Sequence, residues 1–246
     1  DLQKCDEIIA KLDALISKHG KPSAFINACA YTAVDAAEDD YENALAVNGT
    51  AVGILSKFCF ENDIPFVHYS TDYVFAGDGE TAWDENSPVS PLGAYGKSKL
   101  EGEKHIQHNA TDNSKWLIFR TSWVYNEDGK NFVNTMLRLA KDRDVLSVVN
   151  DQIGAPTYAT DIASYTIKAL ENALKKDSFP SAIYHLRNEG ETSWHNFANT
   201  IFELARKKRQ IHGWRLFAYS QNPHTDQFNF IVFAAPKRER RINEQR

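Results

Sequence analysis

Strand-sized apolar runs alternate with longer amphipathic stretches along most of this 246-residue chain. From Cys5 to Ile16 the apolar residues recur at intervals of three and four, which predicts a helix that ends at Gly20. A strand-sized run at 24–28 follows, and the same alternation continues to a helix over 194–206. Such alternation favours right-handed crossovers and a mostly parallel sheet covered on both faces. We therefore predict a doubly wound α/β fold.

The remaining elements follow from the same periodicities. Helices are predicted over 38–62, 94–108, 131–141 and 161–174, strands over 64–69, 116–120, 145–149 and 182–186, and a long loop over 70–91. Beyond residue 206 the pattern weakens, although 214–219 and 228–235 have strand-like composition. We therefore expect a divergent tail over 207–246.

Composition and charge exclude several classes of protein. With 42% hydrophobic and 25% charged residues, the chain has the composition of a soluble globular protein. No apolar run approaches the roughly 20 residues that a bilayer requires, so no membrane partner is expected. The net charge is -5 and the only basic cluster spans 237–241, which argues against a nucleic-acid partner.

The cysteines and histidines give no sign of a disulfide framework or a metal site. Cys5, Cys29 and Cys59 are far apart and show no CxxC spacing, which favours a reducing, cytoplasmic compartment. His105 and His108 lie three residues apart without a third ligand in suitable spacing, so we interpret them as surface histidines and predict no metal. His68, inside an apolar strand, is interpreted as a buried, hydrogen-bonded histidine rather than as a base, and Cys29 as a packing residue.

Polar residues that follow the predicted strand over 64–69 are candidates for a site. Ligands of open α/β sheets bind beyond the carboxyl ends of the strands, and the run Ser-Thr-Asp-Tyr-Val-Phe occupies 70–75 at such an end. Taken alone, this run is equally typical of a capped turn. Its hydroxyl groups indicate a functional site only in combination with the residues that follow.

Tyr95 and Lys99 lie four residues apart at the start of a predicted helix. That spacing places them on one helical face, about one turn apart. A phenol with a pKa near 10 exchanges its proton poorly at neutral pH, but a nearby ammonium lowers that pKa. A hydroxyl at a strand end, such as that of Thr71, would then hold a carbonyl group near the phenol. Tyr-x-x-x-Lys also arises by chance on many amphipathic helices.

Together these motifs resemble the extended short-chain dehydrogenase/reductase superfamily and, within it, the dTDP-4-dehydrorhamnose reductase family. The resemblance covers about residues 1–206 and follows the order and spacing of the family. It rests on the stretches 26–35, 70–77, 91–103, 120–125 and 150–157.

The resemblance implies a Rossmann-like fold and reduction of the 4-keto group of dTDP-4-dehydro-L-rhamnose to dTDP-L-rhamnose with NADPH or NADH. It assigns the catalytic roles to Thr71, Tyr95 and Lys99. Tyr95 would protonate the C4 oxygen, Lys99 would lower the pKa of the phenol and bind the nicotinamide ribose, and Thr71 would bind the carbonyl. It further implies cofactor contacts at Asn27, Ala28, Ala30, Asn48, Tyr95 and Lys99, and substrate contacts at Asp72, Tyr73 and Trp123. A dTDP-sugar is the expected small-molecule partner, and the oligomeric state, with a homodimer among the options, is left open.

The chain departs from the family pattern at both ends. We find no strand and Gly-rich turn before a helix, the segment that holds a cofactor pyrophosphate, and the one Gly-x-Gly is Gly77-Asp78-Gly79 in a loop. We therefore expect an N-terminally truncated dinucleotide-binding domain over 1–122, to which part of 143–172 returns. Residues 123–246 are expected to form mainly a smaller substrate-binding lobe.

Two other functions are compatible with these observations. The absent glycine turn favours a non-catalytic or regulatory homologue on the same fold, whereas the intact Thr71, Tyr95 and Lys99 favour a reductase. Another nucleotide-sugar enzyme, an epimerase or a dehydratase, is the third alternative. The motifs at 70–75 and 150–157 favour the reductase over it.

Overall fold

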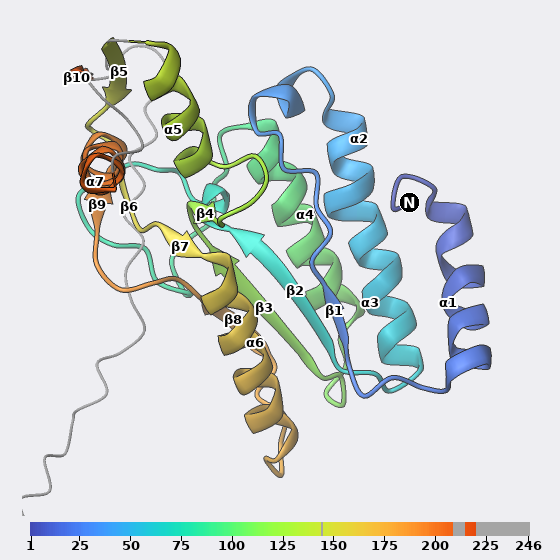
Figure 1. Cartoon of the computed structure of the whole chain (residues 1–246). Helices are drawn as coiled ribbons and strands as arrows, with labels where there is room; N and C mark the ends of the chain where they lie inside the picture. Colours follow the sequence, from blue (N-terminus) through green and yellow to red (C-terminus); the bar gives the residue numbers. More distant parts are fainter. Residues whose placement is uncertain (144, 209–214, 220–246) are drawn as a thin grey trace, which may run out of the picture.

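A computed structural model describes residues 1–143, 145–208 and 215–219, and the predicted strand over 228–235 lies outside them. Four parallel strands form the main sheet in the order β1, β2, β3, β8 (Figure 1). Their bounds are Phe25–Asn27 for β1, Phe66–Thr71 for β2, Trp116–Thr121 for β3 and Ala182–His185 for β8. Because β2 and β3 are central and almost wholly buried, they carry few polar side chains before their carboxyl ends.

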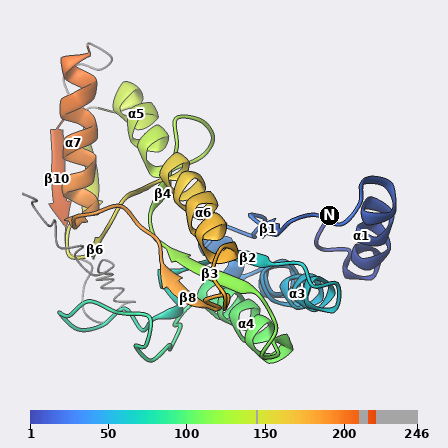
Figure 2. The same cartoon turned by 90° about the horizontal axis from the view of Figure 1, so that it is seen from below.

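Helices cover both faces of this sheet. Figure 2 shows α3 (Ala51–Glu61) and α4 (Ala94–Asn109) on one face and α6 (Ala159–Leu174) on the other. The helix α1 (Cys5–His19) packs against α3 at the edge of the molecule and ends before Gly20, as predicted. The predicted α/β fold with a parallel sheet is confirmed. Its main core is formed by Ile8, Ala51, Val52, Leu55, Phe58, Cys59, Ile64, Phe66, Ile106 and Ile118.

The structure corrects the continuous helix predicted over 38–62. The segment is divided into a 3-10 turn η1 (Asp35–Glu38), a short helix α2 (Tyr41–Leu45), a π turn η2 (Ala46–Thr50) and α3. The side chain of Asn48, within the π turn, bonds to the backbone of Tyr31 and to Ser98. A π turn re-aims a side chain that regular periodicity would place elsewhere, which hydropathy alone does not reveal.

The strand predicted over 64–69 is displaced by two residues. The structure places β2 at Phe66–Thr71, so that Ser70 and Thr71 belong to the strand itself. The turn before the strand is longer than expected because Asp63 takes a positive φ of 49° and Ile64 bonds back to Cys59.

A second, smaller core lies at the other end of the chain. It contains α5 (Phe132–Asp142), α7 (Trp194–Lys207) and the parallel pair of β5 (Val145–Val149) with β10 (Arg215–Tyr219). The strand β10 falls within the strand-like segment over 214–219. This core is formed by Met136, Ala140, Leu146, Val148, Ala198, Ile201, Phe202 and Ala205. The predicted domain boundaries near 122 remain a prediction.

Short two-stranded pairs connect the two cores. They join β4 (Val124–Tyr125) to β7 (Thr157–Tyr158) in parallel and β6 (Ile153–Gly154) to β9 (Thr192–Ser193) in antiparallel orientation. Because β4 begins directly after β3, the pair of β4 and β7 lies beside the carboxyl end of the sheet.

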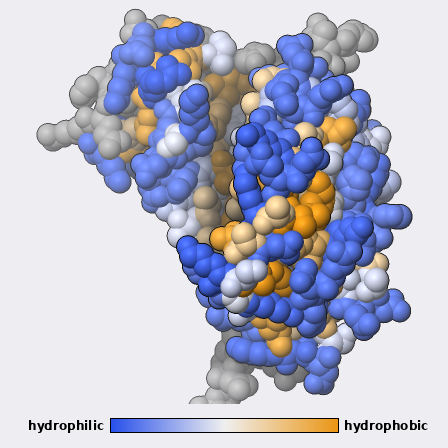
Figure 3. All heavy atoms as spheres, turned by 90° about the vertical axis from the view of Figure 1, so that its right-hand side faces the viewer, coloured by the Kyte–Doolittle hydropathy of each residue, from blue (hydrophilic) through white to orange (hydrophobic). Residues whose placement is uncertain are grey.

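Figure 3 shows the α1 side of the molecule, where hydrophobic residues form a patch within a mainly hydrophilic surface. On this side Leu15 of α1 and Ile26 of β1 are exposed and line an apolar pocket together with Ile16 and Phe25. No helix among the residues that the structure describes is both long and apolar enough to cross a bilayer.

Candidate active site

Tyr95 occupies the first turn of α4, next to the carboxyl end of β2. The helix begins at Ala94, and its first amide donates to Glu38 Oε1 at 2.7 Å, which satisfies a backbone donor that the helix itself cannot. The ring of Tyr95 lies edge-to-face against Tyr73, with centroids 5.6 Å apart. These contacts fix the direction of the phenol.

Thr71 is brought to Tyr95 by the end of β2. Its hydroxyl donates to Asp72 Oδ1 at 3.1 Å and accepts from the backbone amide of Tyr73 at 3.2 Å, which begins the 3-10 turn η3 (Asp72–Val74). The hydroxyl of Thr71 also acts on Tyr95, because as a hydrogen-bonding neighbour it lowers the pKa of the phenol. The strand end and the helix start, which the sequence places far apart, therefore meet at these hydroxyl groups.

The close approach of α4 to this turn depends on Gly96. A Cβ at this position would lie 2.2 Å from the backbone oxygen of Tyr73 and 3.0 Å from Pro91. Only glycine permits that separation without moving the backbone. Gly96 therefore sets how near Tyr95 comes to Thr71.

The acidic groups of the site are strongly affected by burial. Burial raises the pKa of Tyr95 to about 12, with the charge of Asp72 acting in the same direction and the hydrogen bond to Thr71 opposing it. Burial likewise raises the pKa of Asp72 to about 7, against hydrogen bonds that lower it. For Tyr73 burial is again the main cause of a raised pKa. At neutral pH both phenols hold their protons, and Tyr95 is equipped to donate one. The structure corrects the expectation that Lys99 lowers the pKa of the phenol, because burial raises it and Lys99 contacts Tyr69 and His68 instead.

Lys99 is almost completely buried on the same face of α4, one turn after Tyr95. Its Nζ donates to the backbone oxygen of Tyr69 at 2.6 Å and lies 3.2 Å from His68 Nε2. Burial lowers the pKa of Lys99 to about 8, while the charge of Glu103 acts in the opposite direction. Lys99 can therefore gain or lose a proton near neutral pH.

The predicted cofactor residues lie in and around the segment after β1. Asn27 ends β1 with a buried side chain, whereas Ala28 is exposed and Ala30 half-buried in the following segment. Asn48 is buried and holds both backbone groups of Tyr31, with distances of 2.9 and 3.0 Å. Asn48 is thus placed to shape this segment.

Trp123 is placed beside the carboxyl end of β3, in a left-handed backbone conformation with a φ of 47°. Its indole stacks on Trp194, the first residue of α7. A Cβ at Gly154 would lie 2.5 Å from the same ring, so the glycine provides the room that the indole needs. Residues from the second core therefore hold this aromatic side chain.

Several buried polar atoms at this end of the sheet are available to a ligand. Within the described part of the chain, Asp72 Oδ2, Ser70 Oγ, Thr121 Oγ1 and both ring nitrogens of His185 have no hydrogen-bond partner. Buried polar atoms are normally paired, so this concentration fits a polar ligand. With Tyr95 and Lys99 beside it, the end of the sheet suits the ribose and carbonyl groups of a nicotinamide cofactor and its substrate.

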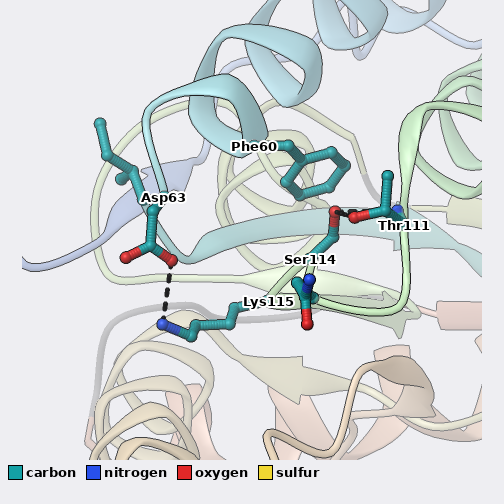
Figure 4. Close-up of a pocket in the computed structure, with 7 residues that line it drawn as sticks. Phe60, Asp63, Thr111, Ser114 and Lys115 are labelled. Atoms are coloured by element: carbon teal, nitrogen blue, oxygen red, sulfur yellow. Dashed lines mark hydrogen bonds and ion pairs between the residues drawn. The ribbon is translucent and has the colours of Figure 1, made fainter.

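A separate pocket lies at the amino ends of β2 and β3, away from the candidate site (Figure 4). It is lined by residues that precede β2 and β3, including Phe60, Asp63, Thr111, Ser114 and Lys115. Lys115 and Asp63 form an ion pair of 3.0 Å across it, and Lys21 also contacts Asp63. None of the predicted site residues lines this pocket.

Sequence reasoning missed four residues that support the site. The interpretation of His68 did not connect it to Lys99, and Trp194, Glu103 and Arg120 were not singled out as contacts of the site. One neighbour of His68 could have been predicted from the sequence. Asn27 and His68 occupy matching positions in adjacent parallel strands, and side chains in register lie on the same face of a sheet. The contact of Trp194 with Trp123 had no such signal.

Comparisons with known proteins identify the family of this chain. The model of the RmlD substrate binding domain family matches residues 3–226. The dTDP-4-dehydrorhamnose reductase of Salmonella typhimurium is 50% identical over 187 residues, 76% of this chain and 61% of that protein. The reductase of Burkholderia thailandensis is 48% identical over 191 residues, 76% of this chain and 63% of that protein.

A solved structure of a reductase is also similar to this chain. The crystal structure of the dTDP-4-dehydrorhamnose reductase of Bacillus anthracis in complex with NADP superposes with a TM-score of 0.81 and 30% identity, and covers 96% of this chain and 78% of that one. The chain spans less than two thirds of the length of the two curated relatives. Because the family model covers most of the chain, the protein belongs to the RmlD substrate binding domain family.

Proposed function

We propose that this protein reduces the 4-keto group of dTDP-4-dehydro-L-rhamnose to dTDP-L-rhamnose with NADPH or NADH. The observation that carries the proposal is the convergence of Thr71, Tyr95 and Lys99 at the carboxyl end of β2. The names of the similar curated proteins support the substrate, and the NADP in the Bacillus anthracis structure supports the cofactor.

The roles of the three residues follow from their chemistry. A bound nicotinamide supplies the hydride. Tyr95, whose pKa is about 12, keeps its proton at neutral pH and donates it to the oxygen at C4. Thr71 donates a hydrogen bond to the same oxygen and stabilises the charge that develops on it. Lys99, whose pKa is about 8, is the nearby group that returns a proton to the phenolate of Tyr95.

The substrate contacts involve both cores. Asp72 presents Oδ2 without a partner among the described residues and can bond to a sugar hydroxyl. Tyr73 and Trp123 offer aromatic surface for the sugar ring. The proposal includes two further assignments. Residues 123–246 form mainly the substrate lobe, which the separate apolar core of α5 and α7 supports. The loop over 27–30 and Asn48 contribute to cofactor binding.

We further propose that the protein acts in the cytoplasm. All three cysteines, including the exposed Cys29, are free thiols in the structure. Free thiols are typical of a reducing compartment.

The test uses the full chain, NADPH and dTDP-4-dehydro-L-rhamnose. NADPH oxidation and formation of dTDP-L-rhamnose, separated by chromatography, are expected. Tyr95→Phe should lower turnover by about 10² to 10⁴, because the phenol acts as the acid, and the Kd for NADPH measured on the same variant reports the contribution of the phenol to cofactor binding. Tyr165→Phe, an exposed tyrosine of α6, is the matched control.

The alternative functions give different results in the same assay. NADPH binding without turnover, equal in wild type and Tyr95→Phe, would indicate a non-catalytic homologue. A changed nucleotide-sugar without net consumption of NADPH would indicate an epimerase or a dehydratase. Either outcome contradicts the proposal.

A further inference from the structure

The first turn of α4, which carries Tyr95, is capped by a side chain from a distant segment. The N-cap residue is Gly93, which has no side chain to accept from the free backbone amides of the helix start. Glu38, the last residue of η1, supplies the acceptor, and its Oε1 lies 2.7 Å from the backbone nitrogen of Ala94. Glu38 and Ala94 are 56 positions apart, so this cap forms only in the folded chain.

Gly93 leaves the room that this contact needs. A Cβ at Gly93 would lie 2.8 Å from Glu38 Oε1, closer than the two atoms can approach without displacing the carboxylate. The φ of Gly93 is -89°, a value that residues with side chains adopt readily, so the backbone conformation does not require glycine. Serine, threonine, aspartate or asparagine, the usual cap residues, would compete with Glu38 for the same amides. The glycine therefore leaves the helix start to Glu38.

Apolar contacts place η1 against the same turn of α4. Ala37, which precedes Glu38, is completely buried and shares a small core with Ala94, against which Tyr31 and Tyr95 pack. The cap therefore acts on a helix start that already touches η1. Because the ends of helices fray readily, a hydrogen bond to the amide of Ala94 limits the motion of the next residue, Tyr95.

The segment after β2 contacts this turn as well. Gly96 lies against the backbone oxygen of Tyr73, and the ring of Tyr73 lies edge-to-face against the ring of Tyr95. These contacts fix which way the Tyr95 ring faces. The hydrogen bond from Ala94 to Glu38 fixes where the backbone that carries the ring begins. The two sets of contacts together define the place of the phenol.

Glu38 acts on the position of the phenol and not on its affinity for a proton. The pKa of Tyr95 is shifted by burial, by Asp72 and by Thr71, and Glu38 is not among these causes. A carboxylate at a helix N-terminus also interacts favourably with the helix dipole, but that interaction needs only the charge. A hydrogen bond needs an acceptor oxygen in the right place. A neutral amide at position 38 therefore distinguishes the two effects.

We propose that Glu38 is a positioning residue, which holds the first turn of α4 against η1 and keeps the phenol of Tyr95 beside the hydroxyl of Thr71. The inference rests on the proposed function for its catalytic meaning, because Tyr95 is the acid of that reaction. Glu38 also links two parts of the site, since η1 follows the loop over 27–30 that we assign to cofactor binding. The position of Tyr95 is measurable without turnover.

The first experiment follows the cap by NMR in chain labelled at the alanine nitrogens. The Ala94 amide is identified by its loss in Ala94→Gly, and its exchange with deuterated water is measured. Glu38→Ala should speed this exchange by about 10-fold or more, because a hydrogen bond to a charged group is lost. Glu38→Gln keeps an acceptor oxygen and should recover most of the protection. The control Glu42→Ala, at an exposed glutamate of α2, should leave the exchange unchanged.

The ring of Tyr95 gives a second readout in the same variants. Its proton signals, identified by their loss in Tyr95→Phe, are shifted by the ring of Tyr73 that lies against it. Glu38→Ala should move these signals toward those of an exposed tyrosine, and Glu38→Gln should restore them. Unchanged Tyr95 signals in Glu38→Ala overturn the proposal. Equal effects of the two substitutions also overturn it, because they would assign the role of Glu38 to its charge.

Gly93→Ala tests the contact without altering Glu38, which is itself exposed, so that neither substitution leaves a buried charge. The added methyl group should push the carboxylate away from Ala94, speed exchange of the Ala94 amide and shift the Tyr95 signals. In a Glu38→Ala background the same substitution should have little further effect, because both residues act through one contact. Additive effects in the double variant contradict the proposal.

The second experiment measures catalysis in the same variants. Glu38→Ala should lower kcat by about 10-fold, because a displaced acid transfers its proton less readily, whereas KM for the keto sugar should change much less. The pH profile of kcat should keep its midpoints, since Glu38 does not shift the pKa of Tyr95. Glu38→Gln should recover most of the activity, and Glu42→Ala should match wild type. A wild-type kcat in Glu38→Ala contradicts the positioning role.

These readouts separate the two proposals. If the NMR signals change as expected but the wild-type chain does not oxidise NADPH with the keto sugar, the positioning role stands and the proposed function fails. If the wild-type chain oxidises NADPH while Glu38→Ala keeps the wild-type Tyr95 signals and kcat, the reverse holds.

Discussion

The indole rings of Trp123 and Trp194 stack with centroids 3.5 Å apart and planes 12° from parallel. Trp194 also contacts Phe132 and Phe197, so the stack joins the end of β3 to the second core. The left-handed backbone of Trp123 is a conformation that a bulky residue adopts only where its surroundings compensate. The stack and the space over Gly154 provide that compensation.

Gly154→Ala should destabilise the fold, because the added Cβ would lie 2.5 Å from the Trp123 ring. We expect the free energy of unfolding to fall by about 1–3 kcal/mol, as for overpacked sites, measured by urea denaturation. In a Trp123→Ala background the same change should cost much less, since the clashing ring is gone. Equal costs in the two backgrounds would show that the ring and the glycine are not coupled.

Asp72→Asn should change the pH dependence of stability. The folded pKa of Asp72 is raised to about 7, so the native state binds more protons than the unfolded chain between about pH 4 and 7. The contribution of Asp72 to stability therefore falls as the pH rises through that window. Relative to wild type, Asp72→Asn should gain stability as the pH rises, by up to about 4 kcal/mol.

Urea denaturation of both proteins at several pH values tests this expectation. Asp78→Asn, at an exposed aspartate of the following loop, is the control and should show no such trend. A stability difference that is independent of pH would mean that Asp72 has an ordinary pKa.

Glu103→Gln should destabilise the protein strongly. Glu103 and Arg120 are 1% and 4% exposed and form a bidentate pair, with bonds of 3.0 and 2.6 Å. Removing one partner leaves a buried charge unpaired, which costs about 3–5 kcal/mol. Glu101→Gln, which breaks the exposed pair with Lys104, is the matched control and should cost at most about 1 kcal/mol.

The double variant Glu103→Leu with Arg120→Met separates charge from packing. Because neither charge remains, it should recover most of the stability lost by Glu103→Gln, measured as the free energy of unfolding. A double variant as unstable as Glu103→Gln would assign the loss to packing.

Asn48→Ala should weaken the loop that follows β1. The variant removes both hydrogen bonds to the Tyr31 backbone and the bond to Ser98, so we expect a loss of about 1–3 kcal/mol. If this loop contacts the cofactor, the Kd for NADPH measured by fluorescence titration should also rise. The control variant is Asn43→Ala, which removes an exposed asparagine amide on α2. An unchanged Kd for NADPH in Asn48→Ala would place the loop around Tyr31 away from the cofactor.

The fold was predictable where hydropathy has a simple period. The helix α1 and the strand β3 begin at or next to the predicted residues because their apolar positions follow the helical and buried-strand patterns. The stretch over 38–62 was mispredicted because a 3-10 turn and a π turn divide it, and Asn48 in the π turn bonds to Tyr31 and Ser98. A side-chain contact between distant residues leaves no trace in local periodicity.

For the site, the sequence by itself determined the reacting groups: the hydroxyl of Thr71 at a strand end and the four-residue spacing of Tyr95 and Lys99 on one helical face. Only the tertiary structure decided their environment. Whether Lys99 faces a histidine, a backbone oxygen or the phenol depends on how α4 packs on β2. Spacing along one element fixes which side chains are neighbours, whereas burial and partners from other strands fix their protonation, because both arise only when distant segments meet.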